Sequence, residues 1–63
     1  MRYWNVWYQD KRTKEKEYRN IRNETYEGAR QVRQKTMSKA KRELYHFYSK
    51  EECQALNLPL TAE

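Results

Sequence analysis

Residues 25–42, TYEGARQVRQKTMSKAKR, form the longest stretch of this 63-residue chain with a regular helical pattern. On a helix at 100° per residue, the apolar and small side chains fall on one side, over an arc of roughly 140°. Asn23 or Thr25 can cap the start by accepting a hydrogen bond from an early backbone N–H. We therefore predict one helix over residues 25–42. Its inner face contains Thr25, Tyr26, Ala29, Val32, Thr36, Met37, Ala40 and Leu44.

Two residues of this helix depart from the simple pattern. Gly28, in the first turn, costs up to ~1 kcal/mol relative to Ala, which indicates either fraying or a close neighbour. Arg33 projects near the centre of the apolar stripe. Either its stem packs on the core while the guanidinium reaches the edge, or it is an interface arginine that pairs with a carboxylate or phosphate of a partner.

Aromatic-rich stretches lie on both sides of the helix, RYWNVWYQ at residues 2–9 and ELYHFYS at residues 43–49. Aromatic and β-branched residues favour strands. If the two strands are neighbours in a sheet, their aromatic side chains form cross-strand pairs. Alternation along the first strand places Trp4, Val6 and Tyr8 on one face and Tyr3, Asn5 and Trp7 on the other.

The remaining segments are polar or short. Asp10 can head a turn by accepting bonds from backbone N–H groups two residues on, and residues 16–22 can return as a second strand after a loop of three to five residues. Ser49 and Glu52 match a capping box, which predicts a short helix over residues 50–56. The leucines that follow it, Leu56, Leu58 and Leu60, are expected to fold back onto the body.

Together these elements predict an α+β fold. The chain is expected to be a single small ββαβ(α) domain over residues 1–63, with a three-stranded antiparallel sheet packed on one helix. The strands are expected at about residues 2–9, 16–22 and 43–49, with helices at about 25–42 and 50–56. A 3/4 spacing that continues past both ends of the main helix leaves an alternative, an all-α chain with one long helix over 10–48 plus a short C-terminal helix.

Composition limits the size of the core and the kinds of site. Aliphatic residues are few, whereas the nine aromatics (six Tyr, two Trp and one Phe) can each bury about 150–250 Å². A core of this kind is thin, which favours a homo-oligomer or a subunit ordered on a larger partner. With one Cys and one His, we expect no metal, no cofactor and no internal disulfide. Without a long apolar run or a signal-peptide pattern, an intracellular, cytoplasmic location is expected.

No catalytic constellation is visible in the sequence. A nucleophile–base pair would need His46 beside Ser38, Ser49 or Cys53, and the local sequence gives no reason for that geometry. The single glycine excludes a Gly-rich phosphate loop. The chain is therefore not expected to be an enzyme.

Protein binding is the favoured hypothesis, because interfaces are enriched in Tyr, Trp, Met and Arg. A basic module of this size is typical of a phage-type inhibitor or of a peripheral subunit of a larger assembly. The helical stretch is strongly basic, with six Lys or Arg and one Glu in residues 25–42, and the whole chain has a net charge of +5. The predicted partner-binding residues are Tyr3, Trp7, Arg30, Arg33, Lys35, Lys39, Lys41 and Arg42.

Nucleic-acid binding is the alternative hypothesis. Basic residues alternate with aromatics in RYW at residues 2–4 and in WYQDKR at residues 7–12, and such a surface can stack bases and neutralise phosphates. A self-complementary flat aromatic patch would instead favour a dimer or a protein contact. Nucleic acid is favoured if Tyr3 and Trp7 share a face with Lys11, Arg12 and Arg19.

Overall fold

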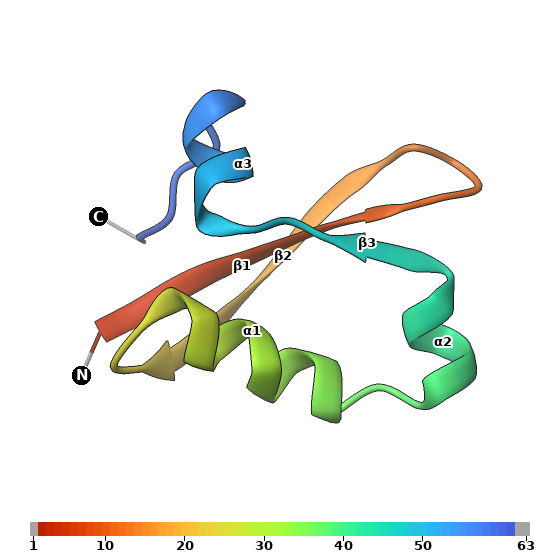
Figure 1. Ribbon diagram of the computed structural model, residues 1–63, viewed down its shortest axis with the longest axis horizontal. Helices are drawn as coiled ribbons and strands as arrows, with labels where there is room; N and C mark the ends of the chain where they lie inside the picture. The colour runs from red at the N-terminus through yellow and green to blue at the C-terminus, as the bar shows by residue number, and fades with distance from the viewer. Residues whose placement is uncertain (1, 62–63) are drawn as a thin grey trace.

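The computed structural model describes residues 2–61, which form a three-stranded antiparallel sheet and three helices (Figure 1). The elements are β1 (Arg2–Asp10), β2 (Lys16–Asn23), α1 (Tyr26–Lys35), α2 (Lys39–Glu43), β3 (Tyr45–Phe47) and α3 (Lys50–Ala55). The strand order is β2-β1-β3. The predicted α+β fold is confirmed, and the alternative of one long helix over 10–48 is wrong because the chain forms β2 within that range.

The β1–β2 hairpin is the longest paired unit of the sheet, running from Arg2 opposite Asn23 to Gln9 opposite Lys16. Asp10 closes it, because its Oδ1 accepts hydrogen bonds from the backbone N–H groups of Arg12 and Thr13. This is the turn chemistry that the sequence predicted.

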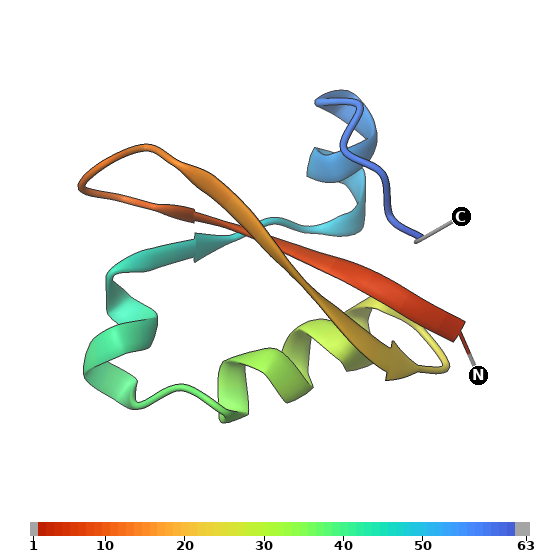
Figure 2. The same ribbon diagram turned by 180° about the vertical axis from the view of Figure 1, so that it is seen from behind.

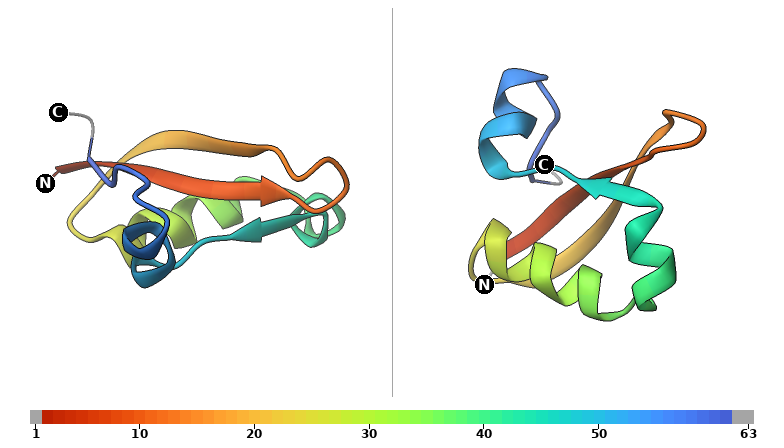
Figure 3. Two further views of the ribbon diagram at one scale, coloured as in Figure 1. Left: turned by 90° about the horizontal axis from the view of Figure 1, so that it is seen from above. Right: turned by 45° about the vertical axis from the view of Figure 1, so that its right-hand side comes forward.

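Helix α1 lies on one side of the sheet, and α3 lies on the other (Figure 1; Figure 3, right). The core forms between β1 and α1, since the alternation of β1 turns Trp4, Val6 and Tyr8 toward the helix. Val6 and Ala29 are completely buried. The buried apolar residues are Trp4, Val6, Tyr8, Tyr26, Ala29, Met37, Phe47, Tyr48 and Cys53.

The helix predicted over residues 25–42 is divided in two, which corrects the sequence prediction. Thr36 is the C-cap of α1, and its hydroxyl donates to the carbonyl of Arg33. Ser38 has extended backbone angles and accepts a hydrogen bond from the N–H of Lys41, so it caps α2. Ser and Thr hydroxyls compete with helical backbone bonds in this way. The break between the two helices lets Met37 turn into the core, where it is 7% exposed.

The predicted inner face of the helix is only partly buried. Tyr26, Ala29 and Met37 are buried, whereas Val32 is 40% exposed and Leu44 is 38% exposed. The other predicted members that are exposed are Thr25, Thr36 and Ala40. Gly28 has a close neighbour, since a Cβ at this position would lie 2.4 Å from Oδ1 of Asn23. Thr25 caps α1, as expected, by accepting from the N–H of Gly28.

The third strand is shorter than the predicted 43–49 because Leu44 is still the C-cap of α2. Its position beside β1 is confirmed, and it brings the aromatic clusters together: the ring of Tyr8 lies 5.4 Å from Phe47 and 5.2 Å from Tyr45. The capping box of Ser49 and Glu52 is present and starts α3.

After α3, the chain returns to the same edge of β1. The N–H of Asn5 donates to the carbonyl of Leu60, and Trp4 forms an isolated antiparallel bridge with Thr61. Leu58 and Leu60 pack against the core as expected, whereas Leu56 stays 50% exposed. Helix α3 thus lies in the sequence between two segments that both pair with β1.

Candidate functional site

The side of the sheet opposite α1 carries the most distinctive set of exposed side chains, and we call it the far face. In an antiparallel pair, residues directly opposite one another project to the same side. The register therefore places four side chains from each strand of the hairpin on this side. The far face consists of Tyr3, Asn5, Trp7 and Gln9 from β1, and Lys16, Tyr18, Asn20 and Arg22 from β2.

Three aromatic side chains stand on the far face. The rings of Trp7 and Tyr18 are stacked at a tilt, with centroids 4.8 Å apart. Tyr18 is 53% exposed and Tyr3 is 56% exposed. Along β1, Tyr3 precedes Trp7 by four residues, about 13 Å at 3.3 Å per residue. The aromatic groups therefore stand near both ends of the face.

Between the aromatic groups lies a hydrogen-bonded amide pair. Asn5 is only 4% exposed, and both polar atoms of its side chain have partners: its Nδ2 donates to the carbonyl of Pro59, and its Oδ1 accepts from Nδ2 of Asn20 at 2.9 Å. The Nε1 of Trp7 also donates to the carbonyl of Pro59, at 2.8 Å. The segment around Pro59 therefore covers part of the far face along β1, while the far-face side chains of β2 stay exposed.

Two of the eight far-face side chains are charged, and both are positive. Lys16 and Arg22 are exposed at opposite ends of β2, and none of the eight far-face residues is acidic. The cations named in the sequence hypothesis are placed differently. Arg19 lies opposite Val6, so it projects to the α1 side. Arg12, in the hairpin loop, is bonded to Asp10.

The structure divides the predicted partner-binding residues between two sides of the sheet. Tyr3 and Trp7 lie on the far face, whereas the helical cations belong to α1 and α2. Two of these cations interact within the chain: Arg30 is paired with Glu27, and Arg33 extends its guanidinium over the ring of Tyr8, with Cζ 5.4 Å from the centroid. The other predicted helical cations are exposed, and they are Lys35, Lys39, Lys41 and Arg42.

A shallow depression of about 400 Å³ lies where the end of α1, α2 and β3 meet. Lys39 and Arg42 contribute positive charge to it, Glu43 contributes a negative charge, and Tyr45 and Phe47 provide aromatic walls. Such a mixed lining can hold an acidic side chain beside an apolar one, but it has no enclosed geometry that would hold a small molecule.

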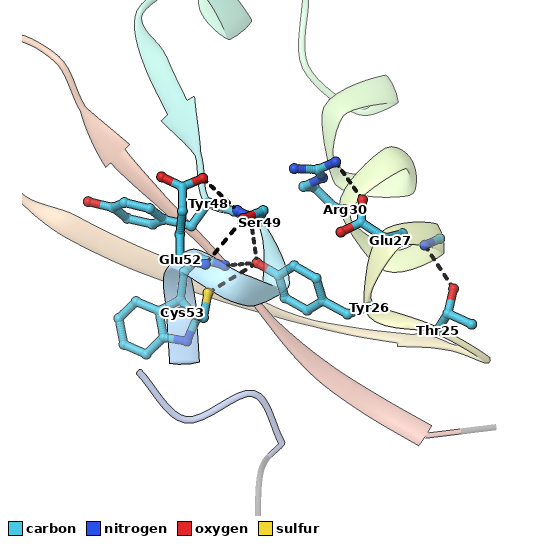
Figure 4. Close-up of polar contacts among 10 residues, drawn as sticks. Thr25, Tyr26, Glu27, Arg30, Tyr48, Ser49, Glu52 and Cys53 are labelled. Atoms are coloured by element: carbon cyan, nitrogen blue, oxygen red, sulfur yellow. Dashed lines mark hydrogen bonds and ion pairs between the residues drawn. The ribbon is translucent and has the colours of Figure 1, made fainter. Parts of the chain in front are cut away.

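A second cluster is buried between the two sides, where β3 leaves β1 (Figure 4). The hydroxyl of Tyr26 donates to the carbonyl of Tyr48 at 2.9 Å, accepts from the N–H of Trp7 at 3.4 Å, and lies 3.5 Å from Sγ of Cys53. It therefore satisfies backbone groups that would otherwise face a gap in the sheet. Burial raises the pKa of Tyr26 above its ordinary value, and it also raises the pKa of the Cys53 thiol.

The candidate nucleophiles are all engaged in structural contacts. Ser38 and Ser49 cap helices, and Cys53 is completely buried against Tyr26. His46 is bonded instead to Glu52, at 2.9 Å, and this contact lowers the pKa of the carboxyl, as does the bond from the N–H of Ser49. Within residues 2–61 there is no group of three or more His, Cys, Asp or Glu that could hold a metal ion. No helix in that range has the length and hydropathy needed to cross a membrane.

Comparison of the chain with protein-family models, curated proteins and solved structures gives no match. The candidate site therefore rests on its own geometry. The sequence hypothesis missed Lys16, Tyr18 and Arg22 as members of the surface that contains Tyr3 and Trp7. The register of the hairpin would have identified them, because a loop centred between Arg12 and Thr13 sets Tyr18 opposite Trp7.

Proposed function

We propose that this chain is a small binding module that holds single-stranded nucleic acid on the far face of its sheet. The observation that carries the proposal is the combination of stackable aromatic rings and exposed cations with no acidic side chain on that face. Single-stranded nucleic acids are bound by such surfaces, because bases stack on aromatic rings while Lys and Arg neutralise the backbone.

Each part of the far face has a distinct role in this proposal. A base stacks on the exposed ring of Tyr18, which Trp7 supports from its other side, and another base contacts Tyr3. Lys16 and Arg22 flank these positions and neutralise phosphates. The Oδ1 of Asn20 is available to accept from a base edge, since only its Nδ2 is used by Asn5. Stacking tolerates every base, so the proposed preference is for unpaired strands rather than for one sequence.

The test is a fluorescence-anisotropy titration of a short labelled oligouridylate, with a duplex of equal length for comparison, at two salt concentrations. We expect tighter binding of the single strand. Tyr18→Ala should raise its Kd about tenfold or more, because stacking is worth about 1–3 kcal/mol per base. Arg22→Gln should reduce the slope of log Kd against log salt by about 0.7, the value for one lost phosphate contact on a single strand.

Arg42→Gln is the matched control, because Arg42 is also exposed but belongs to α2 on the other side. It should leave the affinity for the oligouridylate nearly unchanged. Equal losses from Arg22→Gln and Arg42→Gln would mean that the whole basic surface attracts the strand non-specifically. No effect of Tyr18→Ala would contradict the stacking role.

A second candidate function, binding of an acidic protein segment, is favoured by the depression beside α2. There, Lys39 and Arg42 lie next to aromatic walls, and Leu44, the C-cap of α2, is an exposed apolar residue. A labelled peptide of alternating Glu and Leu should bind this surface, and Lys39→Glu should weaken it about tenfold. Tyr18→Ala should not change peptide binding. The reverse pattern, loss with Tyr18→Ala only, would exclude this surface as the peptide site.

A further inference from the structure

Among residues 2–61, no strand pairs with the outer edge of β2. Figure 2 shows β2 in the foreground, with no other element in front of it. In β1, the backbone groups of Asn5 and Trp7 bond to the C-terminal segment and to the chain after β3. Because successive residues of a strand direct their backbone groups to opposite edges, Trp4, Val6 and Tyr8 bond to β2. Their partners on β2 face inward, so the residues with outward N–H and C=O groups are Lys16, Tyr18, Asn20 and Arg22.

An edge of this kind can pair with a second copy of itself, and the charges of β2 discriminate between registers. A two-fold axis at Arg19 would set Arg19 against its own copy and Lys16 against Arg22, so like charges would meet. An axis one residue earlier, at Tyr18, sets Glu17 opposite Arg19 twice and Lys16 opposite Asn20. Opposite charges on directly facing residues stabilise a strand pair, and like charges destabilise it.

We propose that two copies of this chain pair antiparallel through β2, with Tyr18 of each copy at the two-fold axis. The outward backbone groups of Lys16, Tyr18 and Asn20 then form the new ladder, and the sheet becomes six-stranded. Glu17 and Arg19 are both exposed and project to the α1 side, where they form two identical intermolecular ion pairs. The thin core of a 63-residue chain gains stability from such an association.

This register also joins the two far faces. Tyr18 of each copy stands beside the other, so the aromatic row continues as Trp7, Tyr18, Tyr18 and Trp7 across the axis. The pairing does not depend on the proposed nucleic-acid function, because its ion pairs lie on the opposite side of the sheet. Failure of one proposal therefore leaves the other intact.

The experiment is sedimentation equilibrium of the full chain from about 1 μM to about 1 mM, with charge-swap variants. The wild-type chain should dimerise. Glu17→Arg and Arg19→Glu should each raise the dimer Kd about tenfold, because each turns two attractive pairs into repulsive ones. The double variant Glu17→Arg with Arg19→Glu should restore the wild-type Kd, since it only exchanges the two charges across the axis.

Circular dichroism of each variant confirms that the sheet is formed, and either single variant suffices if the other fails to fold. A chain that is monomeric at every concentration would overturn the proposal. A dimer whose Kd is the same in wild type and in the single variants would also overturn it, because the axis would then lie elsewhere. An axis at Asn20, for example, sets Arg19 opposite Ile21 and Glu17 opposite Asn23, so the charge swaps would break no ion pair. The double variant leaves every far-face side chain unchanged. Its titration with oligouridylate therefore tests the proposed function separately from dimer formation.

Discussion

Replacing Tyr26 with Phe should lower the free energy of unfolding by about 2–3 kcal/mol, a large part of the stability of so small a domain. The ring would keep its packing against Trp4, where the centroids lie 6.2 Å apart, and only the hydroxyl would be lost. Without it, the N–H of Trp7 and the carbonyl of Tyr48 remain buried with no partner at this position. A buried polar group left without a partner costs about 1–3 kcal/mol.

Urea unfolding followed by circular dichroism measures this loss, and thermal unfolding should show a decrease in Tm of about 10 °C or more. Tyr18→Phe is the matched control, because Tyr18 is 53% exposed. That variant should stay within about 0.5 kcal/mol of wild type. Hydrogen exchange gives a second readout: the amide of Trp7 should lose protection in Tyr26→Phe only. Equal stability of the two variants would mean that water replaces the Tyr26 hydroxyl without cost.

The parts of the fold that could be predicted depend on short-range patterns. Alternation along residues 2–9 identified the two faces of β1, because successive side chains of a strand project to opposite sides whatever their burial: Trp4, Val6 and Tyr8 pack in the core, and Tyr3, Asn5 and Trp7 lie on the far face. The helix caps at Thr25 and Ser49 could also be predicted from a short-range pattern, since each hydroxyl accepts a hydrogen bond from an N–H three residues away. The break between α1 and α2 was not predicted. Ala40 and Leu44 continue the helical period past it, and the benefit of burying Met37 is a tertiary effect.

The candidate site was predicted only in part, for a related reason. Tyr3 and Trp7 were assigned to one face because they belong to one strand. Placing Tyr18 and Arg22 on the same face requires the pairing register of the hairpin, and the loop has no Gly that would indicate this register. In fact Lys14 takes the left-handed conformation there, with φ of 66°. The role of Tyr26 was also beyond the sequence, because its hydroxyl contacts segments that lie 19, 22 and 27 residues away.

The same buried cluster predicts that stability falls in alkaline solution. Burial raises the pKa of both Tyr26 and Cys53 in the folded chain, whereas the ordinary values are 10.0 for Tyr and 9.0 for Cys. Above these values the unfolded chain has lost protons that the folded chain still holds. Stability is therefore fully present below about pH 9 and decreases as the pH rises further. Tyr26 and Cys53 together can contribute a decrease of up to about 2.7 kcal/mol per pH unit.

Urea unfolding at several values from about pH 8 to about pH 11 measures this slope. Wild type should lose stability steeply above about pH 9.5. Tyr26→Phe should begin less stable but decline with a shallower slope, because the Tyr26 contribution is lost while those of Cys53 and of Tyr48, whose pKa burial also raises, remain. Cys53→Ala should remove the Cys53 contribution in the same way. Tyr18→Phe should follow the wild-type curve, because Tyr18 is 53% exposed and lies outside this buried cluster. A wild-type slope that persists unchanged in Tyr26→Phe would show that its hydroxyl is not the group that resists ionisation.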